Sequence, residues 1–211
     1  MTVRIGVLDI GNTRVKRAMW DGRRLRPLKG KVDVWIGARV GRAKPPSGTL
    51  ILGRDFPPLV RNRAKNPGTV GTDRLAQASA AWWRAQGPCV VVALGTAITI
   101  DVVNGRGDFL GGLIAPGLRM MARALHRDTA LLPEVEPLRV RTALGRHTVA
   151  AIQSGLSCAV EGLIRRALEE HRGRVFGTGG DAPLFRDLFD AHVPELGLEG
   201  VALSYQCSRP S

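Results

Sequence analysis

Short apolar runs separated by turn residues mark the first part of the chain. Residues 3–9 and 14–20 alternate between apolar and polar side chains and are rich in β-branched residues, which is typical of strands. Asp21-Gly22 is a hairpin-turn signal and predicts a third strand after it. Residues 32–36 and 49–52 have the same character, so we expect this part of the chain to form a sheet.

A helix is expected after these strands. Residues 73–86 are rich in alanine, and Thr72 or Asp73 suits the N-cap position. The preceding stretch, 56–70, carries prolines and basic residues and is expected to be mostly loop. Gly87-Pro88 ends the helix, and we place a domain boundary there, which gives domains 1–87 and 88–211.

The second part of the chain repeats the order of strands followed by helices. Apolar residues from Val149 to Leu168 follow helical spacing, and Thr148 is suited to cap this long helix. The pattern predicts an α/β protein. In this part we expect strands over 90–94, 97–103, 109–115 and 174–176, helices over 118–126, 148–171 and 183–191, and a small terminal element over 200–203.

Composition and charge narrow the class of protein. Hydrophobic residues make up 44% and charged residues 23%, which is ordinary for a soluble domain. The net charge of +13 could indicate nucleic-acid binding. The arginines are spread along the chain, however, and no nucleic-acid module is recognisable. The surplus of positive charge fits a site for anionic substrates, and we expect no nucleic-acid partner.

The cysteines and the first residues of the chain indicate in which cellular compartment the protein lies. Cys89, Cys158 and Cys207 lack the spacing of metal or redox motifs, which favours buried thiols in a reducing cytoplasm. No apolar run reaches the length of a membrane span, and the chain starts with a strand and not with a signal peptide. We therefore expect a cytoplasmic protein without a membrane partner.

The segment from Asp9 to Lys16 is the first candidate phosphate site. Gly11 allows close backbone approach, Asn12 and Thr13 offer donors, and Lys16 supplies a point charge. Asp9 at a strand end is suited to hold magnesium through water. An ordinary β-hairpin would explain the same residues, and this segment alone does not decide between the two.

A second segment of this kind strengthens the interpretation that the chain binds phosphate groups. Gly95-Thr96-Ala97 also follows an apolar strand, and Asp101 lies beyond it. Alone it would be taken for another hairpin. Two such strand–turn units in one chain are able to close on a polyphosphate from both sides, which points to ATP. Asp101 is a second candidate magnesium ligand. No Walker-type loop is present, so the site is of another kind.

Gly71-Thr72-Asp73-Arg74 places a carboxylate and a guanidinium at a helix start. The helix N-terminus favours anions, and Arg74 is suited to a substrate carboxylate. Asp73 is suited to accept a proton from a hydroxyl nucleophile in phosphoryl transfer. A capping Asp beside a surface Arg is the plainer explanation on local grounds.

Two glycine-rich joints leave their role open. Residues 111–117 would either line a ligand pocket or allow tight packing between elements. Residues 178–181 follow an apolar strand and would either lie under an adenine ring or form a plain turn. The four histidines, which have no metal spacing, are read as surface or capping residues.

Seven segments in this order resemble type III pantothenate kinases: DIGNTRVK, GTDR, GTAITID, GGLIAPG, TALLP, HTVAAIQSG and GTGGDA. The resemblance implies two ribonuclease-H-like domains with mixed sheets flanked by helices, as in the actin-like, sugar-kinase and Hsp70-like superfamily. It also implies ATP-dependent phosphorylation of pantothenate to 4′-phosphopantothenate, the first step towards coenzyme A, by a homodimer.

The resemblance assigns roles to single residues. It implies that ATP is bound by Asp9, Gly11, Asn12, Thr13, Lys16 and Thr96. It implies that pantothenate is bound by Gly71, Thr72, Asp73, Arg74 and Thr148, with Asp73 as the catalytic proton acceptor. Magnesium would be held by Asp9, with Asp101 as a further candidate.

Two positions depart from the family pattern. The family has an Asp that holds a monovalent cation where this chain has Ala93, so we expect little dependence on potassium or ammonium. The family has a substrate-contacting Tyr where this chain has Ala64. The alternative to an active kinase is therefore a weak or inactive ATP-binding homologue with a regulatory role, akin to Bvg accessory factors.

Overall fold

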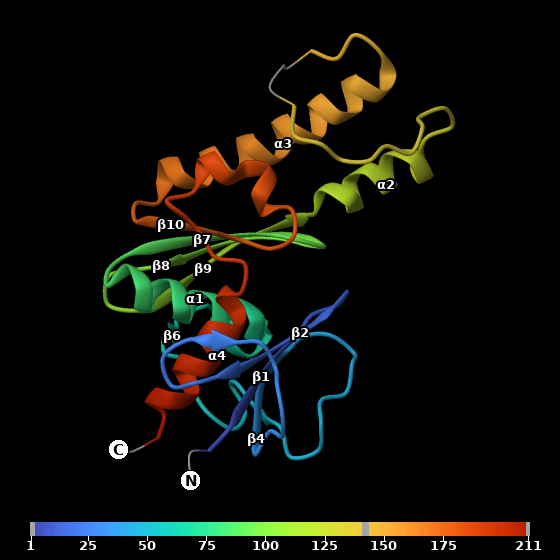
Figure 1. Cartoon of the computed structure of the whole chain (residues 1–211). Helices are drawn as coiled ribbons and strands as arrows, with labels where there is room; N and C mark the ends of the chain where they lie inside the picture. Colours follow the sequence, from blue (N-terminus) through green and yellow to red (C-terminus); the bar gives the residue numbers. More distant parts are fainter. Residues whose placement is uncertain (1–2, 141–143, 210–211) are drawn as a thin grey trace. The chain divides into compact units, whose positions relative to one another are not determined.

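The computed structural model describes residues 3–140 and 144–209 and has a mixed α/β architecture. The described residues form two sheets (Figure 1). The strand order is β3-β2-β1-β4-β5 in the first sheet and β11-β10-β7-β8-β9-β6 in the second. The predicted α/β class is thus confirmed at the level of mixed sheets and helices.

Two compact units divide the chain, and they interleave along the sequence. Unit 1 comprises the described residues of Met1–Cys89, Asp101–Gly111 and Glu195–Ser211. Unit 2 comprises Val90–Ile100 and the described residues of Gly112–Pro194. The division into ribonuclease-H-like domains at Gly87 stays a prediction.

The first sheet is mixed and forms the base of unit 1. β1 (Ile5–Ile10) pairs antiparallel with β2 (Val15–Trp20) and parallel with β4 (Val34–Arg39). The short strands β3 (Leu25–Arg26) and β5 (Leu50–Ile51) lie at its edges. The alternation of apolar residues that predicted these strands also fills the core, with Val7, Ala18, Trp20, Ile36 and Ala38 all buried.

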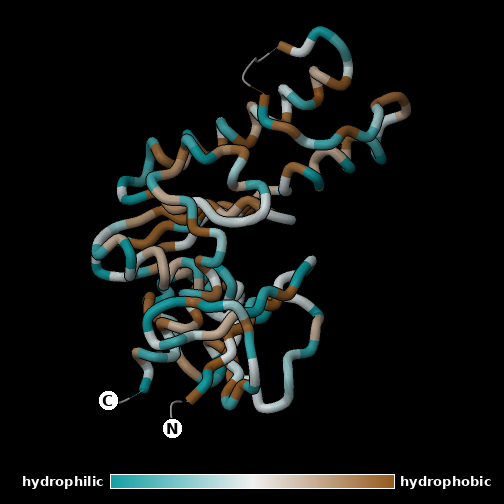
Figure 2. The backbone as a smooth tube through the Cα atoms, in the orientation of Figure 1, coloured by the Kyte–Doolittle hydropathy of each residue, from teal (hydrophilic) through white to brown (hydrophobic). Residues whose placement is uncertain are grey.

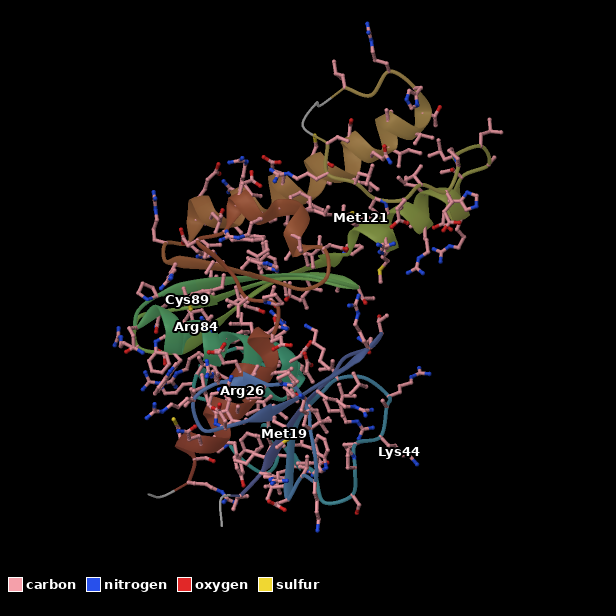
Figure 3. All side chains as sticks on the ribbon, in the orientation of Figure 1. Met19, Arg26, Lys44, Arg84, Cys89 and Met121 are labelled. Carbon is pink, nitrogen blue, oxygen red and sulfur yellow. The ribbon has the colours of Figure 1, made fainter. Side chains whose placement is uncertain are left out.

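Helices α1 (Thr72–Ala85) and α4 (Leu196–Cys207) pack together within unit 1. Gly200 allows the close approach, because a Cβ there would lie 1.7 Å from the Ala76 carbonyl oxygen. Arg84, labelled in Figure 3, pairs with Glu199 at 2.8 Å across the two helices. Helix α4 is much longer than the small element expected at 200–203, because glycines within it weaken its helical signal.

Unit 2 contains β10, β11 and parts of the strands β7, β8 and β9 of the second sheet. Its core joins strand residues such as Val92 and Ile98 to the buried face of the long helix, for example Leu156 and Val160. Along this helix hydrophobic and hydrophilic residues follow one another at short intervals (Figure 2). The elements are β7 (Cys89–Leu94), β8 (Ala97–Val103), β9 (Asp108–Pro116), α2 (Leu118–Asp128), α3 (Thr148–Glu170), β10 (Arg174–Thr178) and β11 (Ala191–His192), of which parts of β7, β8 and β9 belong to unit 1.

Several local expectations are corrected. Gly71 and not Thr72 or Asp73 is the N-cap of α1, and His147 and not Thr148 is the N-cap of α3. The predicted loop 56–70 contains the short strand β6 (Arg61–Asn62) and the turn η1 (Pro67–Thr69), and the expected helix 183–191 is the 3-10 segment η2 (Ala182–Leu188). Prolines in both stretches explain the short elements, because they remove backbone donors.

Candidate active site

Asp9 lies near the end of β1, beside the end of the parallel strand β4. Asp9 is half-buried, and this burial raises the pKa of its carboxyl group. The positive charge of Lys16 lowers the pKa, and the neighbouring Asp73 carboxylate raises it. Asp9 and Asp73 are therefore electrostatic neighbours in unit 1, although they are far apart in sequence.

The turn after β1 is narrow because of two glycines. The Gly11 N–H donates to the Arg14 carbonyl oxygen at 3.1 Å and closes the turn through Asn12 and Thr13, whose side chains are exposed. A Cβ at residue 41 would lie 2.1 Å from the Gly11 carbonyl oxygen, so the loop after β4 runs directly against this turn. Lys16 follows on β2, opposite Asp9 in register.

Asp73 lies in the first turn of α1 and folds back on its own helix. Its Oδ1 accepts a hydrogen bond from the Arg74 backbone N–H at 2.9 Å. A Cβ at residue 71 would lie 2.5 Å from the same Oδ1, so only glycine leaves the carboxylate this position. Burial raises the pKa of Asp73, and the hydrogen bond and the charge of Arg74 oppose this.

Thr72 fastens the start of α1 to the first sheet. The Arg39 backbone N–H donates to Thr72 Oγ1 at 3.0 Å, and this hydroxyl also lies 3.3 Å from the Arg39 carbonyl oxygen. Arg39 ends β4. The hydroxyl of Thr72 thus ties the helix start to the strand ends near Asp9, which explains its place in the motif.

Arg74 points to Asp101 on β8 within unit 1. Its Nε donates to Asp101 Oδ1 at 3.0 Å and Oδ2 at 3.2 Å, and Nη2 donates to Oδ1 as well. Asp101 is fully buried, and the guanidinium lies over the Phe109 ring, 5.6 Å from its centroid. The Nε edge of Arg74 is therefore occupied by a protein carboxylate.

Thr96 lies in unit 2, in an exposed turn enclosed by glycines. The Gly117 N–H donates to the Thr96 carbonyl oxygen at 3.0 Å, and a Cβ at residue 117 would lie 2.0 Å from the Gly95 carbonyl oxygen. The loop after β10 approaches the same strand end, since the Asp181 N–H donates to Leu94 O at 3.0 Å. Both glycine-rich joints thus serve close backbone packing around this turn.

Thr148 opens α3 and lines a cavity of about 560 Å³ in unit 2. His147 Nδ1 accepts from the Ala150 N–H at 3.4 Å and caps the helix. The walls of the cavity are mainly apolar and come from α2, α3 and the segments that join them: Leu125, Leu132, Gly145, Arg146, Ala151, Ile152, Gly155 and Leu156 complete the lining.

Two residues near Asp9 were not predicted. Gln77 lies one helical turn after Asp73, and its Oε1 is buried without a hydrogen-bond partner among the described residues. Gly197 of α4 lies beside both, because a Cβ there would be 3.0 Å from Asp9 Oδ2 and 3.7 Å from Gln77 Cγ. The spacing of Gln77 from Asp73 was a signal in the sequence, whereas Gly197 carried none.

The structure gathers Asp9, Lys16, Asp73, Arg74 and Asp101 in unit 1, while Thr96 and Thr148 belong to unit 2. In the described part of the chain, no group of three or more His, Cys, Asp or Glu side chains is arranged to hold a metal ion. Residues 3–140 and 144–209 contain no helix that is long and apolar enough to cross a membrane.

Comparison with known proteins adds a family and a fold. The family model for type III pantothenate kinase matches residues 48–170. A curated type III pantothenate kinase from Dehalococcoides mccartyi strain CBDB1 is 37% identical over 169 residues, which cover 76% of this chain. The chain spans only 64% of the length of that relative.

Two solved structures share the fold. A protein described as a Baf family transcriptional activator from Campylobacter jejuni superposes with a TM-score of 0.65 at 21% identity, covering 95% of this chain and 97% of its own. The activator of 2-hydroxyisocaproyl-CoA dehydratase from Clostridium difficile, with bound ADPNP, gives a TM-score of 0.53 at 12% identity, covering 98% and 96%.

Proposed function

The chain belongs to the type III pantothenate kinase family, and we propose that it transfers a phosphoryl group from ATP to pantothenate. The product would be 4′-phosphopantothenate, in the first step towards coenzyme A. The observation that carries this proposal is the family match over residues 48–170, which includes Gly71–Arg74, Thr96 and Thr148. The same match favours an enzyme over the regulatory alternative.

Asp73 is the proposed catalytic base. A base that accepts the hydroxyl proton of the substrate works best when its pKa is closer to the operating pH than that of an ordinary carboxyl group. Burial raises the pKa of Asp73, which supports this role. Gly71 and the Arg74 backbone N–H hold its carboxylate in one place, so the group is oriented before substrate arrives.

ATP phosphates are the proposed ligands of the Asp9–Lys16 segment and of Thr96. The narrow turn at Gly11 exposes Asn12 and Thr13, and Lys16 adds positive charge. The fold shared with a protein that binds ADPNP supports a nucleotide site. We also propose the two-domain, actin-like arrangement that the resemblance implies.

Magnesium fits the chemistry around Asp9. Hard cations prefer carboxylate oxygens, and the neighbouring Asp73 carboxylate raises the pKa of Asp9, so a positive charge beside Asp9 would favour its ionised form. We propose that Asp9 holds Mg²⁺, which would neutralise charge on the transferring phosphoryl group. Asp101 is better explained as the counterion of Arg74, since both of its oxygens accept from that guanidinium.

Pantothenate is the proposed ligand of Gly71–Arg74 and of Thr148. The apolar cavity beside Thr148 supports a small organic substrate in unit 2. The Nε edge of Arg74 is held by Asp101, so substrate contact by Arg74 stays a prediction for its other N–H groups. The main role that the geometry supports for Arg74 is to fix the first turn of α1.

A homodimer is also proposed. The family resemblance suggests it, and Leu131 and Leu144 in unit 2 are 92% and 86% exposed, which is costly for large apolar side chains. Light scattering tests this point. A mass close to twice the 22.7 kDa of the chain supports the dimer, and a monomer at working concentrations contradicts it.

A coupled assay of ADP release, run with and without pantothenate, tests the proposed function. We expect ADP release that requires pantothenate and Mg²⁺, and that falls about 10²–10⁴-fold in Asp73→Asn. ATP binding of the variant should stay close to that of the parent. Pantothenate-independent ADP release, or parent-like turnover in Asp73→Asn, would contradict the proposal.

A further inference from the structure

The C-terminal helix α4 begins beside the Asp9 carboxylate, within unit 1. Gly197 of this helix lies next to Asp9 and outside the residues matched by the family model. Three elements meet at this point: β1 brings Asp9, α1 brings Gln77, and α4 brings a residue without a side chain. The absence of a side chain at residue 197 leaves room for the Asp9 carboxylate.

The space beside Gly197 is defined by two side chains. A Cβ at residue 197 would lie 3.0 Å from Asp9 Oδ2 and 3.6 Å from Asp9 Cγ, and 3.7 Å from Gln77 Cγ. A contact of 3.0 Å is tighter than ordinary van der Waals packing, so one of the two groups would have to move. The carboxylate is the end of a side chain and would move first.

The packing of α4 leaves no room for the helix itself to give way. Gly200 lies one turn further along α4, and its Cα faces the Ala76 carbonyl so closely that a Cβ would lie 1.7 Å from that oxygen. The Arg84–Glu199 ion pair also joins α4 to α1. Helix α4 is therefore held against α1, and any added atom at residue 197 acts on Asp9.

We propose that Gly197 is a positioning residue for Asp9: its lack of a side chain keeps the carboxylate in the place from which it serves phosphoryl transfer. This inference rests on the proposed function only for its kinetic consequence. Its structural part, the position of Asp9, is independent of any activity.

The substitution Gly197→Ala separates positioning from stability. Alanine has a higher helix propensity than glycine, so the variant should unfold at the same temperature as the parent or higher. Its turnover should nevertheless fall by roughly 10-fold or more, because small displacements of reacting groups are costly. The KM for pantothenate should stay unchanged, since Asp9 is proposed to act on the ATP side.

Gly68→Ala is the matched control, because a Cβ at residue 68 has no atom within 4 Å and the residue is exposed. It should leave turnover and stability as in the parent. A purely structural role of Gly197 would instead give a Gly197→Ala variant that loses stability and activity together. That result, or parent-like turnover in Gly197→Ala, would overturn the inference.

A nuclear magnetic resonance measurement keeps the test independent of the enzyme activity. The ¹³Cγ resonance of Asp9 reports the environment and the protonation of its carboxyl group. We expect its chemical shift at one fixed pH to differ from the parent in Gly197→Ala and to match the parent in Gly68→Ala. If the parent shows no kinase activity, a changed Asp9 resonance still supports the positioning role, and an unchanged one overturns it.

Discussion

The buried ion pair between Arg74 and Asp101 should contribute strongly to the free energy of unfolding. The Asp101 side chain is fully buried and that of Arg74 is 14% exposed, so water cannot replace either partner. We consider the substitution Asp101→Asn. It keeps the size of the side chain and removes the charge that balances the guanidinium.

Leaving a charge without its partner in such a site costs about 3–5 kcal/mol of unfolding free energy. For a chain of this size, each kcal/mol lowers the melting temperature by about 2–4 °C, so we expect a decrease of roughly 6–20 °C. Calorimetry of the parent and of Asp101→Asn measures it directly. The control is Asp128→Asn, whose partner Arg127 is 77% exposed, so its loss should leave the melting temperature close to that of the parent.

A double variant tests the reason for this cost. Replacing both partners by apolar residues, Arg74→Met with Asp101→Leu, removes both charges and should restore most of the lost stability. A melting temperature of Asp101→Asn close to that of Asp128→Asn would refute the reasoning. So would a double variant that is less stable than Asp101→Asn.

Three further outcomes are expected. Asp9→Asn should be more stable than the parent at neutral pH. The pKa of Asp9 in the folded state lies above its ordinary value of 3.8, so the parent loses stability as the pH rises from 3.8 through the folded-state pKa. Urea unfolding at several pH values should show that the difference between the two proteins vanishes in acid. Gln77→Met should raise stability by about 1 kcal/mol, because it removes a buried oxygen without a partner in the described part of the chain, and a decrease would show that the oxygen is bonded. Turnover should be similar in potassium, ammonium and sodium buffers of equal ionic strength, since Ala93 offers no side-chain oxygen, and saturable activation by potassium would contradict this.

Most strands and two long helices follow from the sequence because their apolar residues repeat with the period of the element. The predicted strand 97–103 coincides with β8, and the helix predicted from Thr148 to about His171 coincides with α3. Helix α4 was largely missed. Gly197 and Gly200 lower its intrinsic propensity, and it is stabilised by packing on α1, which a local pattern does not reveal.

The candidate site divides in the same way. Asp9, Asp73 and Thr96 belong to local motifs, and each motif carries its own chemical signal. The pairing of Arg74 with Asp101 depends on how β8 lies against α1, which no local pattern reveals, and the roles of Arg74 in substrate binding and of Asp101 in magnesium binding stay predictions. Gly197 is informative only through what surrounds it in space.

The proposed activity of this chain is the formation of 4′-phosphopantothenate. The most direct test is mass spectrometry of the product after incubation of the purified chain with ATP, Mg²⁺ and pantothenate, beside the Asp73→Asn variant. We expect a product one phosphoryl group heavier than pantothenate, formed by the parent and nearly absent with the variant. Unchanged pantothenate with the folded, ATP-binding parent, or equal product from both proteins, would contradict it.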